Sequence, residues 1–488
     1  MNTLKVNFSS NQKEFDNDYL DVVRAFYPYI EYDQSSHTVI ALNLFTSQGF
    51  DYRVMVDIYM DEDTKKPYHY EKFFNLEVNR PILDKKSLKK RHTKAFLYKA
   101  LSEFTGHELP YGSLTGIRPT KLYHDLKAKG MDVDSYFKDE LYVSDEKIKL
   151  ISMICENQEG IYSTDVSQVD VFVNIPICVT RCSYCSFVSA ELRHVKSLIC
   201  PYTKQILDEL KQVKEIITKR NLTVRSVYIG GGTPTSIDDE NFKLIANEAN
   251  FEAFGAKEYT IEAGRPDTIT REKLDIMRDA HVTRISINPQ SFNQKTLDLI
   301  GRSHSIEAVY DVFKMAREYP FDINMDLIAM LPGESLDDFK HSVDEAIRLN
   351  PENITVHTLA LKRGSKLHEE KYDNASLELP SMMVDYAMKA IMDAGYEPYY
   401  MYRQKHMSGN LENVGYTKKG KACIYNIDIM EETTSIMANG AGAISKNVYP
   451  DENRIERFPE PKGIQVFLER ADILPIMRER FFYHIYLD

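Results

Sequence analysis

The sequence predicts an α/β protein built around a partial (β/α)6 barrel. From about residue 165, short apolar runs rich in β-branched residues alternate with longer helical stretches, which is typical of repeated βα units and a parallel sheet. The predicted strands lie at 171–175, 224–229, 258–261, 282–287, 323–329 and 354–359. In such a barrel the residues that follow each strand meet at one rim, so we expect the chemistry there.

The chain extends beyond the predicted barrel at both ends. Two strands at 38–45 and 52–59 predict a hairpin, and a helix over 84–104 ends at Gly106, so the first third is expected to be an α+β domain. After about residue 375 the alternation fades into a Met- and Tyr-rich stretch, expected to be a mainly helical region that covers the substrate. The predicted division is therefore 1–165, 166–375 and 376–488.

Composition limits the class of protein. The 488 residues carry 61 Lys and Arg against 73 Asp and Glu, a net charge of −12, which argues against a general nucleic-acid binder. The N-terminus has no basic region followed by an apolar stretch, and no apolar run is long enough to span a bilayer. We therefore expect a cytoplasmic protein with no nucleic-acid or membrane partner.

Three of the six cysteines, Cys178, Cys182 and Cys185, lie directly after the first barrel strand. Thiolates at this spacing can hold a zinc ion with a fourth ligand from elsewhere, or an iron-sulfur cluster with one iron left open. A structural zinc site usually has a second ligand pair nearby. The other candidate ligands are isolated in the sequence: Cys155, Cys200, Cys423 and His194. The spacing therefore favours the cluster.

The CxxxCxxC motif after a first barrel strand, with the aromatic Tyr184 before the last cysteine, resembles the radical S-adenosylmethionine (SAM) superfamily. The resemblance implies that Cys178, Cys182 and Cys185 hold a 4Fe-4S cluster whose open iron binds SAM. One-electron cleavage of SAM then produces a 5′-deoxyadenosyl radical, while the protein orients the reactants in a dry cavity. Tyr184 and Phe187 are expected beside the cofactors.

Further motifs follow the later strands, as this superfamily requires. The glycine triplet at 230–232 allows close backbone approach to a ligand, and Glu262 supplies a carboxylate for an ammonium or hydroxyl group. Asp326 lies in an otherwise apolar strand, and a buried carboxylate needs a partner. A second ligand's ribose is one candidate partner.

Several longer segments resemble the oxygen-independent coproporphyrinogen III oxidase group. Residues 284–292 and 326–333 carry this likeness, and the flanking segments 112–121 and 399–416 resemble its HemZ branch. Members of the group bind two SAM molecules. The resemblance assigns the first to Gly231, Gly232, Thr233 and Glu262, and the second to Gln290, Arg302 and Asp326.

The implied reaction is oxidative decarboxylation of two propionates of coproporphyrinogen III to vinyl groups, which gives protoporphyrinogen IX in haem biosynthesis. A small reductant protein such as flavodoxin or ferredoxin would supply the electron. Arg403, Lys405 and His406, which lie close to Tyr400 and Tyr402 in the sequence, are candidates to pair with propionates; the alternative is ordinary surface cations over a packed aromatic patch.

Two other functions remain open. The group's decarboxylases have Tyr and His where this chain has Phe172 and Asn174, and a further cysteine where it has Phe187, as in the haem-chaperone branch. The chain is therefore alternatively a haem-binding or trafficking factor. A third hypothesis makes it a radical methyltransferase that uses the second SAM to methylate a tetrapyrrole.

Overall fold

The computed structural model describes residues 4–27, 30–36, 38–46, 51–59, 68–75, 85–116, 118–187, 189–362, 364–370, 372, 378–403 and 411–483. The chain divides into two compact units, Met1–Cys155 and Glu156–Asp488. This break lies before the predicted boundary at residue 165. Glu156–Asp488 is a single compact unit. The further division at residue 375 stays a prediction.

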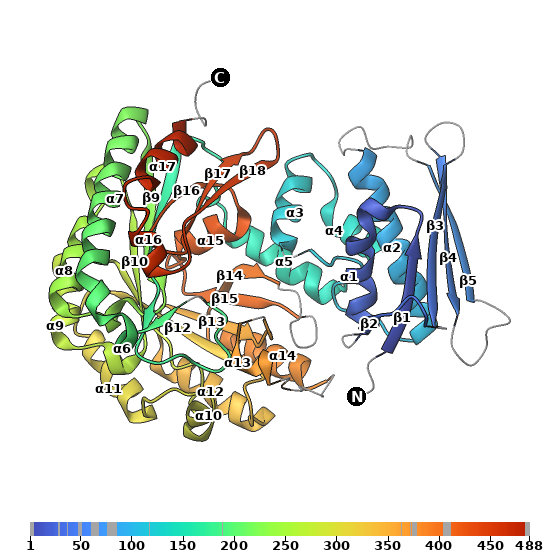
Figure 1. Ribbon diagram of the computed structural model, residues 1–488. Helices are drawn as coiled ribbons and strands as arrows, with labels where there is room; N and C mark the ends of the chain where they lie inside the picture. The colour runs from blue at the N-terminus through green and yellow to red at the C-terminus, as the bar shows by residue number, and fades with distance from the viewer. Residues whose placement is uncertain are drawn as a thin grey trace. The chain divides into compact units, whose positions relative to one another are not determined.

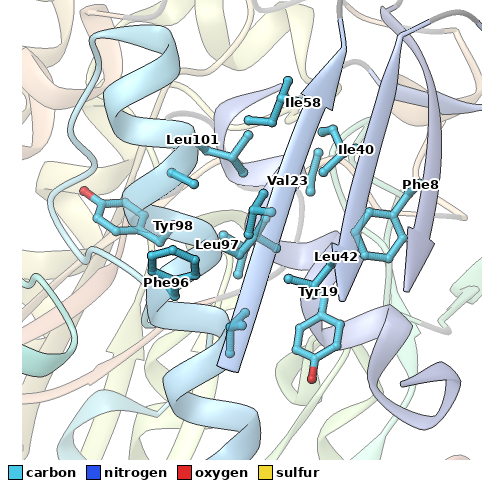
Figure 2. Packing of buried hydrophobic residues seen from close by; sticks show 14 of the residues in the cluster. Phe8, Tyr19, Val23, Ile40, Leu42, Ile58, Phe96, Leu97, Tyr98 and Leu101 are labelled. Atoms are coloured by element: carbon cyan, nitrogen blue, oxygen red, sulfur yellow. The ribbon is translucent and has the colours of Figure 1, made fainter. Parts of the chain in front are cut away.

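The N-terminal unit is α+β, as expected. Its five-stranded sheet has the order β2-β1-β3-β4-β5, and its strands and main helices are β1 (Leu4–Ser10), α1 (Asp16–Phe26), β2 (Ile30–Tyr32), β3 (Val39–Thr46), β4 (Asp51–Tyr59), β5 (Tyr68–Asn75) and α2 (Lys85–Thr105). The predicted hairpin is confirmed as the antiparallel pair β3–β4, although its turn lies outside the described residues. α1 and α2 bury Tyr19, Val23, Leu97 and Leu101 against the sheet (Figure 2). The unit continues with α3 (Pro119–Lys127), α4 (Val133–Ser135) and α5 (Asp145–Asn157), which runs across the boundary.

An eleven-stranded sheet forms the C-terminal unit, in the order β14-β15-β13-β12-β11-β10-β9-β6-β16-β17-β18. Its six central strands pair in parallel and confirm all six predicted barrel strands. Their bounds are β6 (Gln168–Ile175), β9 (Thr223–Gly231), β10 (Glu258–Gly264), β11 (Arg284–Ile287), β12 (Asp322–Ala329) and β13 (Asn353–Thr358). The described strands form an open sheet, in agreement with a partial barrel.

Alternating side chains give this sheet an apolar and a polar face. Apolar positions such as Val171, Ile229 and Ile285 are completely buried. The longer connecting helices lie along the outside of the sheet (Figure 1): α7 (Ile199–Arg220), α8 (Asp239–Glu248), α9 (Arg271–Asp279), α11 (Ile306–Ala316) and α12 (Leu336–Leu349). The shorter helices of this part are α6 (Leu192–Val195), α10 (Gln294–Leu299) and α13 (Lys366–Glu369). Polar residues on the opposite face bond to one another across strands, as in the hydrogen bond between Tyr228 and Glu262.

The region after residue 375 differs from the mainly helical expectation. Its described part has four helices, α14 (Leu379–Asp393), α15 (Ile424–Glu431), α16 (Ile464–Leu468) and α17 (Leu474–Tyr483). It also contributes the strands β14 (Glu397–Tyr402), β15 (Asn413–Thr417), β16 (Ser435–Asn439), β17 (Ile444–Tyr449) and β18 (Arg454–Pro459). These strands extend the sheet at both ends: β15 pairs with β13, and β16 pairs in parallel with β6. Long-range pairing, which the local Met- and Tyr-rich pattern does not reveal, decided this outcome.

Helix α15 packs against β9 and β14. Its N-terminus is capped from the barrel, because the Glu258 carboxylate accepts hydrogen bonds from the backbone N–H groups of Ile424 (2.8 Å) and Tyr425 (3.1 Å). Among the described helices, none is both long enough and apolar enough to cross a membrane.

Candidate functional site

The segment with the three cysteines follows β6 directly. A short strand, β7 (Ile177–Cys178), pairs with β8 (Ala190–Glu191) and frames this cysteine loop. The N–H of Ser183 donates to the carbonyl of Ile300 (3.0 Å), and the N–H of Leu367 donates to the carbonyl of Ser183 (3.0 Å). Backbone hydrogen bonds from two distant segments thus hold the loop at the rim of the sheet.

The three thiols are partly buried and interact electrostatically. Burial raises the pKa of the Cys178 thiol and raises that of Cys185 to about 11, and the neighbouring Cys182 adds to both shifts. The Thr233 hydroxyl donates to the Cys178 sulfur at 3.6 Å. A cationic metal centre stabilises the thiolate forms that burial disfavours, so this environment suits a bound metal cluster.

The donor set of the loop agrees with a 4Fe-4S cluster. Within the described parts of the chain, no group of three or more His, Cys, Asp or Glu side chains is arranged to hold a metal ion. In a cluster each thiolate binds its own iron, so the sulfurs need not converge on one atom. Three soft donors from one loop suit such a cluster with one iron left open.

A buried arginine that the sequence patterns did not single out supports the loop. Arg265 lies directly after β10, is 2% exposed and forms two hydrogen bonds to the carboxylate of Asp267 (2.9 and 2.7 Å). Its guanidinium also donates to the hydroxyls of Thr180 (2.7 Å) and Ser303 (3.0 Å). Arg265, directly after β10, therefore links Thr180 in the cysteine loop to Ser303, which follows α10.

The predicted glycines lie where β9 approaches β6 and β7. Gly231 has φ +105°, and a Cβ atom there would lie 1.7 Å from Oδ1 of Asn174. At Gly232 a Cβ atom would lie 2.6–2.9 Å from backbone atoms of Ile177. Only glycine allows this close approach, which brings Thr233 next to the cysteine loop.

Glu262, on β10, is close to Gly230: a Cβ atom on that glycine would lie 2.8 Å from the Glu262 carboxylate. Burial raises the pKa of Glu262 to about 7; the hydrogen bond from the Tyr228 hydroxyl (2.6 Å) opposes this shift and the nearby Asp326 adds to it. The carboxyl group therefore changes charge near neutral pH.

Gln290 and Arg302, predicted to share a ligand, are both buried. Gln290 has φ +68°, and its backbone bridges to β12 through hydrogen bonds with Asp326 and Ile328 (both 3.0 Å). Arg302 donates to the carbonyl of Asn288. Burial acts to lower the pKa of its guanidinium, but the nearby Tyr184 and Cys182 outweigh this effect and raise the pKa. In the described structure the Gln290 side-chain oxygen and Arg302 Nε have no hydrogen-bond partner, so both remain available to a ligand.

Asp326, which was expected to need a partner for its carboxylate, has partners within the protein. One carboxylate oxygen accepts from the Asn324 amide (2.8 Å), and the other lies 3.7 Å from Nε2 of His357. Nδ1 of His357 in turn lies 3.2 Å from the hydroxyl of Tyr402. Sequence reasoning missed His357; the available signal was its place two residues after Thr355 on the same strand face.

The remaining predicted residues lie in different surroundings. Tyr184 is in the cysteine loop, where burial raises the pKa of its phenol. The Phe187 ring is 69% exposed, whereas Arg403 is 3% exposed at the end of β14. Lys405 and His406 lie outside the described residues.

The two positions before the cysteines have structural roles. The Phe172 ring stacks with Tyr425 (centroids 6.0 Å apart), which stacks with Tyr228 (4.4 Å). Asn174 donates from its amide to the carbonyl of Ala441, in the loop after β16. Tyr228, whose hydroxyl donates to Glu262, therefore belongs to an aromatic stack with Tyr425 and Phe172.

Six parallel strands with a CxxxCxxC loop after the first define a protein of the radical SAM class. In agreement, the family model of the Radical SAM superfamily matches residues 174–346. The chain is 38% identical over 418 residues to the oxygen-independent coproporphyrinogen-III oxidase-like protein HemZ of Bacillus subtilis, which covers 83% of this chain and 82% of that protein. It belongs to this family of coproporphyrinogen oxidase-like radical SAM proteins.

More distant relatives include the heme chaperone HemW of Bacillus subtilis, 31% identical over 195 residues, which span 39% of this chain and 50% of that protein. Among solved structures, the radical SAM coproporphyrinogen III oxidase HemN of Escherichia coli matches with a TM-score of 0.49 and 19% identity, covering 66% of this chain and 73% of that one. Family membership implies a 4Fe-4S cluster and SAM, together with a reductant and a substrate.

Proposed function

We propose that this protein converts two propionate side chains of coproporphyrinogen III to vinyl groups without oxygen, in haem biosynthesis. The observation that carries the proposal is the 38% identity across most of both chains to a coproporphyrinogen-III oxidase-like protein. The polar barrel rim beside a three-thiol loop supports it, because radical chemistry needs side chains that orient the cofactor and the substrate.

Cys178, Cys182 and Cys185 are proposed to hold the cluster, with Tyr184 and Phe187 beside it. When bound, the cluster and SAM supply the radical that removes hydrogen from the substrate. Gly231, Gly232 and Thr233 then present backbone groups to the first SAM, and Glu262 accepts its ammonium or hydroxyl donors. The close approach that these glycines permit supports this assignment.

A second SAM is proposed to bind Gln290, Arg302 and Asp326. The partnerless atoms of Gln290 and Arg302 support this assignment, because buried polar atoms normally have a partner. Arg403, Lys405 and His406 are proposed to meet substrate propionates. A small reductant protein such as flavodoxin or ferredoxin, and a cytoplasmic location, complete the proposal.

The test is anaerobic turnover. The protein is reconstituted with iron and sulfide, given reductant, SAM and coproporphyrinogen III, and 5′-deoxyadenosine and tetrapyrrole masses are followed together. We expect deoxyadenosine together with stepwise loss of two carboxyl groups. Deoxyadenosine with an unchanged tetrapyrrole would refute the decarboxylase, and a tetrapyrrole that gains methyl groups would establish the methyltransferase instead.

A haem-handling function is the second candidate. Phe172, Asn174 and Phe187 depart from the decarboxylase pattern, and heme chaperones are among the relatives. Phe172 and Asn174 are engaged in stacking and in a backbone hydrogen bond, rather than offering a phenol and an imidazole. Stoichiometric haem binding without any change in tetrapyrrole mass would favour this function.

A further inference from the structure

Three polar side chains from strands β12, β13 and β14 lie close together at the rim of the barrel. Asp326 comes from β12, His357 from β13 and Tyr402 from β14, which lies beyond the adjacent β15. Nδ1 of His357 lies 3.2 Å from the Tyr402 hydroxyl, and its Nε2 lies 3.7 Å from the Asp326 carboxylate. The Tyr402 hydroxyl therefore fixes the ring at Nδ1, whereas Nε2 lies beyond hydrogen-bond distance of Asp326.

These three side chains border the candidate site, and two of them are partly exposed. The His357 side chain is 25% exposed and that of Asp326 is 17% exposed. Asp326 and His357 both contribute to the electrostatic environment of Glu262, and Glu262 and Asp326 to that of Tyr402. Groups from β10, β12, β13 and β14 thus face one space.

The charges around that space are unbalanced for an anionic ligand. Glu262 and Asp326 are acidic, whereas Arg265 is engaged within the protein and the Nε of Arg302, free among the described residues, is assigned to the second SAM. Arg265 binds Asp267, and Arg302 binds the carbonyl of Asn288. A ligand carboxylate that enters this rim needs a further hydrogen-bond donor beside the proposed Arg403, because an unpaired carboxylate beside two others is unfavourable.

We propose that His357 is a further binding residue of this site, which donates from Nε2 to a carboxylate of the substrate while the Tyr402 hydroxyl fixes its ring at Nδ1. The proposal rests on the proposed function, because it takes a tetrapyrrole propionate as the carboxylate. In this proposal, His357 on β13 and the Tyr402 hydroxyl on β14 both help to recognise the substrate.

Binding of coproporphyrin III, the stable oxidised form of the substrate with four propionates, tests the proposal on the full-length protein with or without its cluster. The chain has no Trp, so the porphyrin's own absorbance and fluorescence report binding without interference from indole. The tetramethyl ester of coproporphyrin III is the matched probe that lacks ionised carboxylates. SAM binding is measured in parallel by equilibrium dialysis.

We expect wild-type protein to prefer the free acid over its ester, and His357→Gln to weaken binding of the free acid about tenfold with little effect on the ester. Tyr402→Phe, which keeps the ring and removes the hydroxyl, should weaken it less. His281→Gln is the control, because His281 is 65% exposed and pairs with Glu252 on the surface.

Each outcome separates the two proposals. If wild-type protein binds the free acid and His357→Gln binds it equally well, His357 is not a substrate residue. If His357→Gln loses SAM affinity instead, the histidine acts only through Asp326, and the proposal is overturned. If wild-type protein binds SAM but no porphyrin, the substrate of the proposed function is wrong, and the role of His357 falls with it.

Discussion

At the scale of single residues, the chemistry of the site depends on side chains whose surroundings alter their charge. Cys178 and Cys185 resist ionisation because they are buried beside other thiols, and Glu262 titrates near neutrality because it is buried beside Asp326. A positive ligand or cluster reverses both effects, since it favours the ionised forms. Two residue-scale predictions follow from these environments.

Cys182→Ala should lose the cluster, because two thiolates from this loop hold it too weakly. We expect bound iron after reconstitution to fall several-fold and SAM cleavage to disappear, measured by iron analysis and deoxyadenosine formation. Cys200→Ala is the matched control, since Cys200 is exposed on α7, outside the loop. Full iron content and turnover in Cys182→Ala would contradict the cluster assignment.

SAM affinity should rise with pH through the titration of Glu262. Burial raises the pKa of Glu262 to about 7, above its usual 4.5, so at pH 6 the group is mostly protonated and at pH 8 mostly ionised. The ionised form accepts the donors of SAM, so we expect the Kd to fall by up to about tenfold between pH 6 and 8. Equilibrium dialysis on wild type and Glu262→Gln checks this, and an identical pH dependence in the variant would remove Glu262 from the site.

At the scale of elements, the junction of β9 with β6 and β7 is the most constrained part of the rim. Gly231 combines a positive φ with a distance that leaves no room for Cβ beside Asn174. Asn174, at the end of β6, also donates to the carbonyl of Ala441 after β16. The junction therefore connects β6, which the sequence predicts, with β16, which it does not. A substitution in this junction therefore affects two strand ends together.

Gly231→Ala should destabilise the protein by roughly 3 kcal/mol or more, because it adds a steric clash to the backbone cost of about 1–2 kcal/mol. Gly395→Ala isolates the backbone cost alone: Gly395 also has a positive φ (+88°), but a Cβ atom on it would have no neighbouring atom within 4 Å. Denaturant unfolding of both variants compares the two costs. Equal losses of stability would show that the strand ends separate easily.

At the scale of the C-terminal unit, a buried ion cluster joins the last described helix to the barrel. Arg478 on α17 pairs with Glu209 on α7 (2.7 Å) and with Glu460 (2.5 Å), and all three side chains are fully buried. The other Glu209 oxygen accepts from the N–H of Gly440 (2.9 Å), in the loop that holds Asn174. Helix α17 is therefore connected to the site.

Arg478→Ala should lower the free energy of unfolding by about 3–5 kcal/mol, because it leaves two buried carboxylates unpaired. Arg480→Ala, an exposed position on the same helix, should change it by less than about 0.5 kcal/mol. Thermal and denaturant unfolding measure both variants. If Arg478→Ala matches Arg480→Ala, the cluster contributes nothing to stability.

Local patterns in the sequence were sufficient for the barrel strands and the cysteine loop. Short runs of β-branched residues predicted the barrel strands, because such residues favour buried strands. Cys178, Cys182 and Cys185 were recognisable because all three lie within one short segment. The glycines at 231 and 232 were also recognisable, because a strand end that needs close approach admits no other residue.

Only the tertiary structure brought together groups that are distant in sequence. His357 meets Tyr402 and Asp326 through strand pairing across β13, β15 and β14, and Arg265 reaches Thr180 across the rim. Likewise, the strands after residue 375 join both ends of the sheet rather than forming a mainly helical region. Such contacts arise from long-range pairing and burial, which no local pattern of residue types encodes.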